Sequence, residues 1–310
     1  MLKSLSNKAI VALLKLLSIL PYKLLLAIGY GLGFIAARVP SERNHVVKTN
    51  LRLCFPTLDE GAIDQLSKKH WRLLGRSLVE KSIIWCGSEH QLSNMIEVQS
   101  EVDLSDRKPR ILVNMHFVGI EGSIILSALA RRNHWPRTSG FFQRMKSPFF
   151  NQKIIEWRNR FGGNSIDRQG NSIALIREIR KGSLIIIAPD IDLGLKDSIF
   201  VPFFGIQTNT ITAVSRLASI TGAEVCMMIT VLKPDESGYL CTISKPLDDF
   251  PSENPDVDTA RLNQIFEKEI RLRPAEYYWV HKRFKNRPNN EASPYKPSFK
   301  ASFVLSLRHD

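Results

Sequence analysis

The sequence predicts an α/β fold in which helices flank a mixed β-sheet, preceded by an apolar helical segment at the N-terminus. Three short apolar runs of strand length lie at 111–115, 184–188 and 225–232, and stretches with helical spacing of apolar residues separate them. The chain has 310 residues, of which 44% are hydrophobic and 24% charged, so it is able to bury a large core. One large domain with a helical attachment fits this pattern better than two equal domains.

Residues 1–40 form an apolar segment that we expect to attach to a membrane. Between Ala9 and Ala37 the only charged residues are Lys15 and Lys23. The uncharged part is shorter than the roughly 20 apolar residues of a membrane-spanning helix. Pro21 divides the segment, which predicts two short helices or one kinked helix. The sequence leaves open whether the segment spans the bilayer or lies in its interface.

The residues around this segment also favour membrane attachment. No small-residue cleavage site follows the apolar part before Arg38, which argues against a secretory signal peptide. Basic residues flank the segment and suit contact with anionic lipid headgroups. They are Lys3, Lys8, Arg38, Arg43, Lys48 and Arg52. The alternative is a helical hairpin buried at the edge of the domain.

Residues 41–105 are predicted to be a helical lead-in to the core. From Glu42 to about Glu97, apolar residues recur near helical spacing. Pro56 is expected to break this region. Thr57, with Glu60 three residues later, has the pattern of a capping box at the start of the next helix.

Residues 106–288 are predicted to form the α/β core. Helices are expected at 121–132, 173–180 and 210–220, between the buried strands. The later pattern predicts an antiparallel strand, a loop, a helix and a last strand, at 239–244, 251–255, 257–272 and 277–280. Frequent Pro and Asn residues after Arg287 predict a loose tail over 289–310.

The charge balance and the cysteines restrict the partners and the compartment. Lys and Arg (43) outnumber Asp and Glu (30), a formal charge of +13 that attracts nucleic acid, anionic membrane or an acidic protein. The four cysteines, Cys54, Cys86, Cys226 and Cys241, are far apart and form no Cys-x-x-Cys pair. Neither a disulfide framework nor a zinc site is indicated, and a reducing compartment is the simpler inference. We expect no metal and no organic cofactor.

His116 and Glu121 are the candidate catalytic residues. A strand is predicted to end near Met115, Gly119 permits a sharp turn, and a helix is predicted to begin close to Glu121. Residues five apart are not neighbours on a continuous helix, so the pair forms only if the chain turns between them. Glu121 would then orient the imidazole as a general base for a substrate hydroxyl. The alternative is a histidine that only packs in the core.

Several further segments stand in a fixed order along the chain and carry a family resemblance. They are Leu20-Pro-Tyr22, the glycines Gly29, Gly31 and Gly33, residues 50–56, the 111–121 segment with His116 and Glu121, Asp167-Arg168, and residues 189–194, 200–204 and 279–285. In these segments the chain resembles the lipid A biosynthesis lauroyl/myristoyl acyltransferases, within the wider lysophospholipid acyltransferase superfamily. The likeness covers residues 20–288.

The resemblance implies a fold like that of the glycerol-3-phosphate acyltransferases and a specific reaction. The acyl donor would be an acyl-acyl carrier protein, and the acceptor a hydroxyl on a 3-hydroxyacyl chain of a lipid A precursor. The reaction would take place at the cytoplasmic face of a Gram-negative inner membrane. By the same likeness His116 is the base and Glu121 its partner. No Gly-x-Ser-x-Gly nucleophile motif occurs in the chain.

The resemblance also suggests substrate-binding residues. Many members of the family carry an Arg in a Tyr-Arg-Pro segment. Aligned on Pro148, that position falls on Gln143, with Arg144 beside it. Both are candidates for contact with an anionic group of the acceptor, and a solvated surface Arg is the alternative for Arg144.

Asp190, Asp192 and Gly194 match the family's Pro-Asp-x-Asp-x-Gly segment. They are candidates for acceptor binding or for support of the active-site loop, because a loop at the end of a strand is where an α/β sheet builds its site. Turn formation by the aspartates is the alternative. Arg168 is a candidate partner of one of these carboxylates or of a substrate phosphate.

Two aromatic segments are further candidates for the site. Pro202 with its neighbouring phenylalanines suggests either an acyl-chain groove or core packing; these are Phe200, Phe203 and Phe204. Trp279, His281 and Arg283 alternate and would share one face of a strand. His281 is the second candidate for a functional histidine.

Two other functions are alternatives to lipid A acylation. The same fold and dyad would serve another acceptor, such as a lysophospholipid, an ornithine lipid or another glycolipid. A basic nucleic-acid-binding protein is the alternative from a different class. Against it, the aromatic and basic residues do not interleave as in a known binding module, and the apolar N-terminus would have no use.

Overall fold

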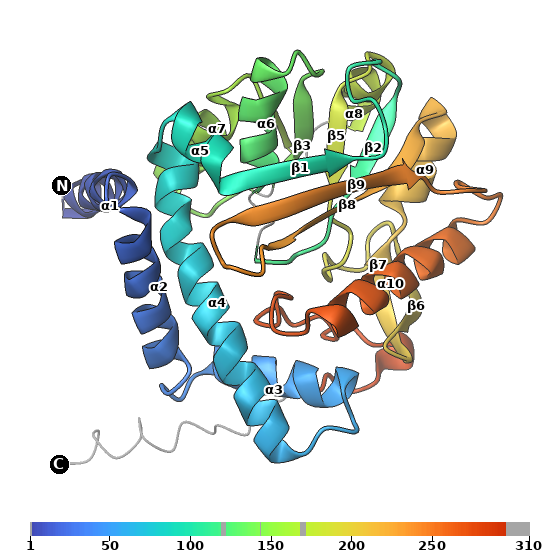
Figure 1. The fold of residues 1–310 in the computed structure, drawn as a ribbon. Coiled ribbons are helices and arrows are strands. Elements are labelled where there is room, and N and C mark those ends of the chain that lie inside the picture. The colour runs from blue at the N-terminus through green and yellow to red at the C-terminus, as the bar shows by residue number, and fades with distance from the viewer. Residues whose placement is uncertain (1, 119–121, 143, 168–171, 296–310) are drawn as a thin grey trace.

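The computed structural model describes residues 2–118, 122–142, 144–167 and 172–295 (Figure 1). Within these residues, a seven-stranded sheet has the strand order β1-β9-β8-β2-β5-β3-β4. Neighbouring strands are parallel except for the antiparallel pair β8 and β9, so the predicted mixed sheet is confirmed. The strands are β1 (Ile96–Ser100), β2 (Arg110–Val113), β3 (Thr138–Phe142), β4 (Asn164–Asp167), β5 (Leu184–Ile187), β8 (Glu224–Leu232) and β9 (Tyr239–Pro246).

The three predicted apolar runs form the centre of this sheet. They are β2, β5 and β8, and β2 pairs in parallel with both of the others. All four residues of β2 are buried, because helices cover both faces of the sheet there. Successive side chains of β2 enter different cores: Ile111 and Val113 lie on one face, and Leu112 lies on the other.

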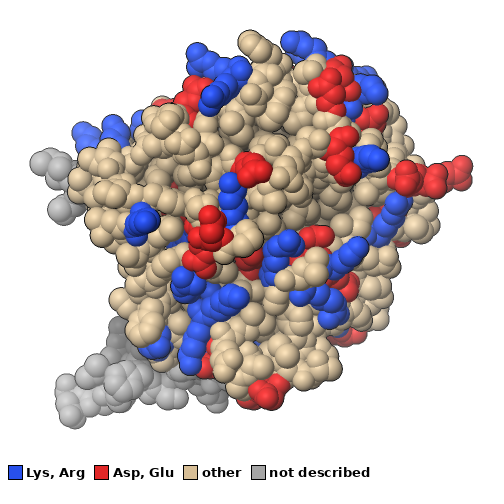
Figure 2. Space-filling view, viewed as in Figure 1, with Lys and Arg blue, Asp and Glu red and all other residues tan. Residues whose placement is uncertain are grey.

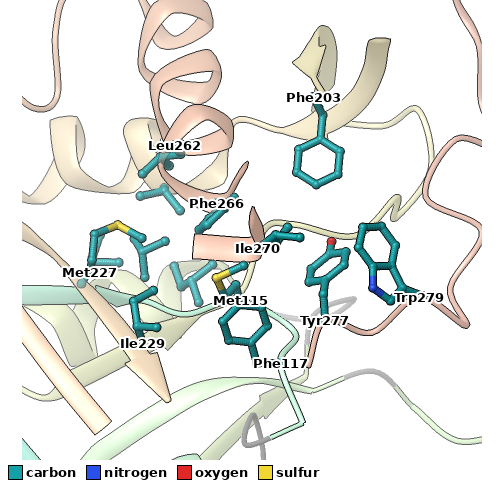
Figure 3. Packing of buried hydrophobic residues seen from close by; sticks show 14 of the residues in the cluster. Met115, Phe117, Phe203, Met227, Ile229, Leu262, Phe266, Ile270, Tyr277 and Trp279 are labelled. Atoms are coloured by element: carbon teal, nitrogen blue, oxygen red, sulfur yellow. The ribbon is translucent and has the colours of Figure 1, made fainter. Parts of the chain in front are cut away.

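The first face carries the larger of the two cores, which we call the α10 core. Figure 3 shows how Met115, Phe117 and Ile229 meet Phe266 and Ile270 of α10 there. Most of its buried helical residues come from α3 (Glu42–Cys54), α8 (Ser172–Arg180), α9 (Ala213–Thr221) and α10 (Pro255–Leu272), and α4 (Glu60–Cys86) adds Ile63. The predicted helices at 173–180, 210–220 and 257–272 are therefore confirmed to within a few residues.

The second face carries what we call the α4 core. The helices that contribute to it are α2 (Tyr22–Ala36), α4 (Glu60–Cys86), α5 (Glu89–Met95) and α6 (Gly122–Arg132). Helix α7 (Pro148–Asn159) lies beside α4, where Trp157 stacks on Trp85 with ring centroids 5.1 Å apart. Helix α7 and strands β3 and β4 were not predicted from the sequence.

The N-terminal segment folds as two helices, α1 (Leu2–Ser18) and α2, with Pro21 directly before α2. This agrees with one of the two predicted forms. Helix α2 packs closely against α4 through Gly33 and Gly75: a Cβ on Gly33 would lie 2.2 Å from the carbonyl oxygen of Trp71. None of the described helices is long and apolar enough to cross a membrane.

The cap of α4 differs from the prediction. Asp59, not Thr57, caps the helix, because its carboxylate accepts a hydrogen bond from the Ala62 amide at 2.7 Å. A capping box exists one helix later, where Ser88 and Gln91 bond reciprocally at the start of α5. Aspartate is as good a capping residue as threonine, so the pattern from Thr57 to Glu60 alone does not show which residue caps α4.

The predicted last strand, 277–280, is wrong. Only Tyr277 forms an isolated antiparallel bridge, with Phe117, and turns follow it. A separate two-stranded sheet, which was not predicted, is formed by β6 (Ser198–Phe203) and β7 (Ile206–Ile211). Phe203 of β6 is buried in the α10 core (Figure 3).

The beginning of the predicted tail is packed against the domain. A short 3-10 helix covers Pro288–Asn290. Tyr295 is 6% exposed, and its hydroxyl contacts both the Asn50 side chain and the Phe284 amide. The segment up to Tyr295 is thus more ordered than its Pro and Asn content predicted.

Candidate active site

His116 lies at the carboxyl edge of the sheet, just beyond β2. The Asn114 amide still continues the β2–β5 ladder by donating to the Ile187 carbonyl at 2.8 Å. The chain then turns, and the His116 carbonyl accepts a hydrogen bond from the Tyr278 amide at 2.8 Å. Backbone bonds on both sides of His116 therefore fix its position.

Asp190 holds the imidazole of His116. Its Oδ1 lies 2.7 Å from His116 Nδ1, and its Oδ2 accepts a hydrogen bond from the His116 backbone amide at 2.8 Å. Asp190 follows β5, the parallel neighbour of β2, so both residues reach the same edge of the sheet. The Tyr277 hydroxyl donates to the Asp190 carbonyl at 3.0 Å and steadies that loop.

The environment of Asp190 keeps its carboxyl ionised. Burial raises the pKa of Asp190, but the interactions with His116 and the charge of Arg283 outweigh it, and the pKa is lowered from its ordinary value. An ionised carboxylate only accepts hydrogen bonds, so His116 Nδ1 carries the proton. Nε2 is then the nitrogen that accepts a proton from a substrate.

His116 lines a cavity of about 750 Å³, a volume typical of a small-molecule site. The His116 side chain is 20% exposed, whereas Asp190 behind it is fully buried. Part of the wall is apolar and includes Leu74, Val118 and Tyr278. The cavity also touches Leu32 of α2 and Leu78 of α4, which are 44% and 57% exposed, so it reaches the surface beside the N-terminal helices.

Residues 2–286 match the sequence model of a family described as bacterial lipid A biosynthesis acyltransferase. The chain belongs to this family. The resemblance stated from the motifs is thereby confirmed.

Curated relatives agree with the family assignment over most of the chain. A lipid A biosynthesis acyltransferase of Haemophilus influenzae is 30% identical over 287 residues, which cover 91% of this chain and 90% of that protein. The lipid A biosynthesis lauroyltransferase of Escherichia coli is 29% identical, with 89% and 90% covered. The lipid A biosynthesis myristoyltransferase of the same organism is 23% identical, with 86% and 82% covered.

In this acyltransferase, Asp192 and Gly194 build the loop that follows Asp190. The Asp192 carboxylate accepts hydrogen bonds from the Gly194 amide at 3.0 Å, Asn209 Nδ2 at 3.0 Å and Asn286 Nδ2 at 2.8 Å. Gly194 has φ +102°, which an L side chain rarely adopts. These contacts fit support of the active-site loop; acceptor binding by the two residues stays a prediction.

His281 contacts this loop and not the reacting end of the cavity. Its Nε2 accepts a hydrogen bond from the Asp192 amide at 3.1 Å. Burial, together with the charges of Lys285 and His116, lowers the pKa of His281 to about 4, so the ring is neutral. A nitrogen already engaged by a backbone amide is a poor base for a substrate.

Trp279 and Arg283 pack in the interior. The Arg283 guanidinium is buried and donates to the Asn209 carbonyl at 2.5 Å and to the Thr210 hydroxyl at 2.8 Å. Trp279 Nε1 donates to the Pro274 carbonyl at 2.6 Å. Neither residue lines the cavity that contains His116.

Arg144 lies at a second cavity, of about 520 Å³, that adjoins the first through Phe142 and Ser165. The Arg144 side chain is 62% exposed, and its Nε is 2.5 Å from Asp167 Oδ2. Its predicted role as an anion contact stays a prediction. Glu121, Gln143 and Arg168 lie outside the described residues, so the structure gives no position for these three predicted site residues.

The contact between Asp190 and His116 is the feature that the sequence analysis missed. Asp190 was a candidate for acceptor binding or for support of the active-site loop, and the orientation of His116 was assigned to Glu121. The available signal was positional: Asp190 closely follows the apolar run 184–188, and buried parallel strands end at one common edge. Sequence alone did not reveal that β5 is the direct neighbour of β2.

Proposed function

We propose that this acyltransferase moves a fatty acyl group from an acyl-acyl carrier protein to a hydroxyl of a lipid A precursor. Membership in the lipid A biosynthesis acyltransferase family supports the reaction class and the acceptor. The lauroyl-, palmitoleoyl- and myristoyltransferase relatives support a fatty acyl chain as the cargo, but they differ in its length and saturation.

The observation that carries the proposal is the imidazole of His116, fixed by Asp190 at the wall of a cavity with apolar lining. His116 Nε2 removes the proton from the acceptor hydroxyl as its oxygen attacks the thioester carbon. Asp190 stabilises the imidazolium that forms. The tetrahedral intermediate then collapses, the C–S bond breaks, and the leaving thiolate takes the proton from Nε2. Glu121 stays the predicted second member of the dyad.

The surface charge supports an acidic protein as the acyl donor. The formal charge is +13, and Figure 2 shows Lys and Arg gathered, with some acidic neighbours, over the face that carries α4 and α10. Acyl carrier proteins are strongly acidic. Such complementarity speeds association and makes it sensitive to salt.

The N-terminal helices support attachment to the cytoplasmic face of the inner membrane. One stripe of α1 is apolar and exposed: Ile10, Leu13 and Leu16 are 45%, 54% and 57% exposed, and Ile19, just after the helix, is 74% exposed. On α2, Leu24, Phe34 and Ile35 are also exposed. Such helices bind in the plane of the bilayer interface, with basic residues against anionic headgroups. We propose that α1 and α2 dock in this way.

The experiment supplies purified protein with labelled acyl-acyl carrier proteins of several chain lengths and with different acceptors in parallel. The acceptors are a tetra-acylated lipid A precursor, a lysophospholipid and an ornithine lipid precursor. Mass spectrometry should detect a gain of one acyl group on the lipid A precursor. A gain only on another acceptor overturns the lipid A assignment, and no gain on any of them overturns acyl-carrier-protein-dependent transfer to a lipid.

A further inference from the structure

The side chain of Asn114 is buried beside the candidate base with one of its polar groups unused. Asn114 follows β2 and is 1% exposed. Its Oδ1 accepts a hydrogen bond from the Met115 amide at 2.7 Å. This bond distinguishes the two ends of the amide, because only oxygen accepts from an N–H. The Nδ2 group is the other end, and the described part of the chain provides no hydrogen-bond partner for it.

An unpaired donor in this position requires a physical reason. Buried polar groups are almost always hydrogen-bonded, since the desolvated group otherwise costs stability. Other buried nitrogens without a partner exist among the described residues, and one of them, Trp71 Nε1 on α4, belongs to a residue that also lines the cavity. Asn114 differs from Trp71 in its position next to the candidate base, because it lines the cavity two residues before His116. The position therefore suggests that the partner of Nδ2 is a bound substrate.

The side chains of Asn114 and His116 lie on the same side of the segment, the side that faces the cavity. Leu112 lies in the α4 core, Met115 lies in the α10 core, and Asn114 and His116 both line the cavity. In an extended segment, residues two apart share a face and are separated by about 6–7 Å along the chain. A carbonyl group attacked by a hydroxyl at His116 Nε2 is then within reach of a donor on Asn114.

We propose that Nδ2 of Asn114 donates a hydrogen bond to the carbonyl oxygen of the transferred acyl group. This inference rests on the acyl transfer proposed above. When the acceptor oxygen bonds to the thioester carbon, the electron pair of the C=O double bond moves onto oxygen, and Asn114 stabilises the resulting oxyanion. The pair returns to re-form C=O as the C–S bond breaks. Asn114 gives up no proton, and the proton passes through His116 alone.

A neutral amide suits this role because it is already oriented before the substrate binds. Its Oδ1 is fixed by the Met115 amide, so the donor does not need to reorganise as negative charge develops. Asn114 is also 1% exposed, and a hydrogen bond to charge is stronger at a buried position.

The test compares steady-state transfer by the wild-type protein with that of Asn114→Ala, Asn114→Asp and Asn114→Thr. Loss of one oxyanion donor is expected to lower kcat by about 10²- to 10³-fold, with KM for the acyl donor within about threefold. Asn114→Asp keeps an oxygen for the Met115 amide but replaces the donor by a negative charge, so its kcat should be lowest. Asn114→Thr restores a donor and should recover part of kcat.

Thr230→Val is the matched control for stability. Thr230 is buried on β8, in the same sheet, and does not line the cavity. The Thr230→Val variant should have a kcat within about twofold of wild type even if its melting temperature falls. This comparison separates a fall in kcat from a general loss of stability.

The outcomes distinguish this inference from the proposed function. If the wild-type protein transfers acyl groups and Asn114→Ala keeps kcat within about threefold, the role of Asn114 is overturned while acyl transfer stands. A change confined to KM, or equal losses in the Ala and Thr variants, also overturns it. If the wild-type protein transfers no acyl group to any acceptor, the proposed function fails and the inference fails with it.

Discussion

At the scale of single residues, the site depends on one carboxylate that contacts the same histidine twice. Asp190 bonds both the ring and the backbone of His116, so it sets the tautomer and the position of the ring together. The sequence analysis singled out His116 as the candidate base because a histidine follows a buried run at a turn. It did not identify Asp190 as its contact, since that depends on which strands are neighbours and not on spacing along the chain.

A second histidine, His70, predicts how stability depends on pH. It is fully buried on α4, and Nδ1 lies 3.1 Å from the Ala275 carbonyl. Burial outweighs that hydrogen bond and lowers the pKa of His70 to about 4. Because an unfolded histidine has a pKa of about 6.5, the unfolded chain takes up a proton between these values that the folded protein does not. Stability should therefore be fully present above about pH 6.5 and be lost as the pH falls towards 4.

Urea unfolding at pH 7, 6 and 5 measures this dependence. His281, whose pKa is also lowered to about 4, contributes in the same direction. The contribution of His70 is at most about 3.5 kcal/mol, at about 1.4 kcal/mol for each pKa unit. His70→Gln removes one of the two titrations, so its unfolding free energy should fall less between pH 7 and pH 5 than that of wild type. An equally steep fall in His70→Gln contradicts the prediction.

At the scale of secondary structure, the contact between α2 and α4 joins the N-terminal segment to the catalytic core. A Cβ on Gly75 would lie 2.2 Å from the Gly29 carbonyl oxygen, and one on Gly33 equally near the carbonyl oxygen of Trp71. The two backbones touch, and residues of α2 and α4 line the same cavity. Helix α2 is thus part of the wall of the site as well as a candidate for membrane contact.

This close packing predicts opposite effects at two neighbouring glycines. Gly33→Ala should lower the unfolding free energy by about 1–3 kcal/mol, because the added methyl group overlaps backbone atoms. Gly31→Ala is the matched control: it lies on the same helix, is exposed, and a Cβ there meets nothing within 4 Å. That change should stabilise the helix by up to about 1 kcal/mol. Equal effects of the two substitutions on unfolding by denaturant would contradict the packing described.

Strands and helices were predictable where burial gives them a clear pattern. The runs that became β2, β5 and β8 are apolar throughout, because both of their faces are covered. Strand β4 was missed because its residues, Asn164–Asp167, include only one buried apolar side chain. The segment 277–280 has aromatic residues typical of a strand, yet Tyr277 and Trp279 fill the α10 core from a series of turns, and Tyr278 lines the cavity.

At the scale of the whole molecule, apolar and basic surfaces suit the two substrates that we propose. The exposed stripe of α1 lies at one end of the molecule, away from α10 (Figure 1). The cavity reaches the surface at Leu32 and Leu78, next to α2. In our proposal, a lipid acceptor enters from the membrane side, while the acidic donor approaches a basic surface.

The stripe predicts how the protein binds vesicles. Leu13→Glu combined with Leu16→Glu should weaken binding to anionic vesicles at least tenfold, because charge replaces apolar surface that enters the interface. Leu272→Glu is the control, since Leu272 is 64% exposed on α10 and should not touch the bilayer. Cosedimentation with vesicles measures both. Unchanged binding of the double variant to vesicles would contradict the proposed docking through α1.

The membrane attachment of residues 1–40 was predicted from their composition, and its detailed form was not. Pro21 indicated two short helices or one kinked helix, and the structure contains two helices. The sequence pattern includes Gly29, Gly31 and Gly33 as one group and does not show which of them let α2 pack on α4. Only the structure separates Gly31, which faces outward, from the two that touch α4.

The central claim is that His116, oriented by Asp190, is the base of acyl transfer. The most direct test is the single-turnover rate of transfer from acyl-acyl carrier protein in wild type, His116→Ala and Asp190→Asn, with Asp64→Asn as a surface control. We predict a loss of about 10³- to 10⁴-fold in Asp190→Asn, because the amide favours the wrong tautomer of His116, with at least as large a loss in His116→Ala. Asp64→Asn should match wild type. If Asp190→Asn, folded as judged by its melting temperature, retains more than about a tenth of the wild-type rate, the account is contradicted.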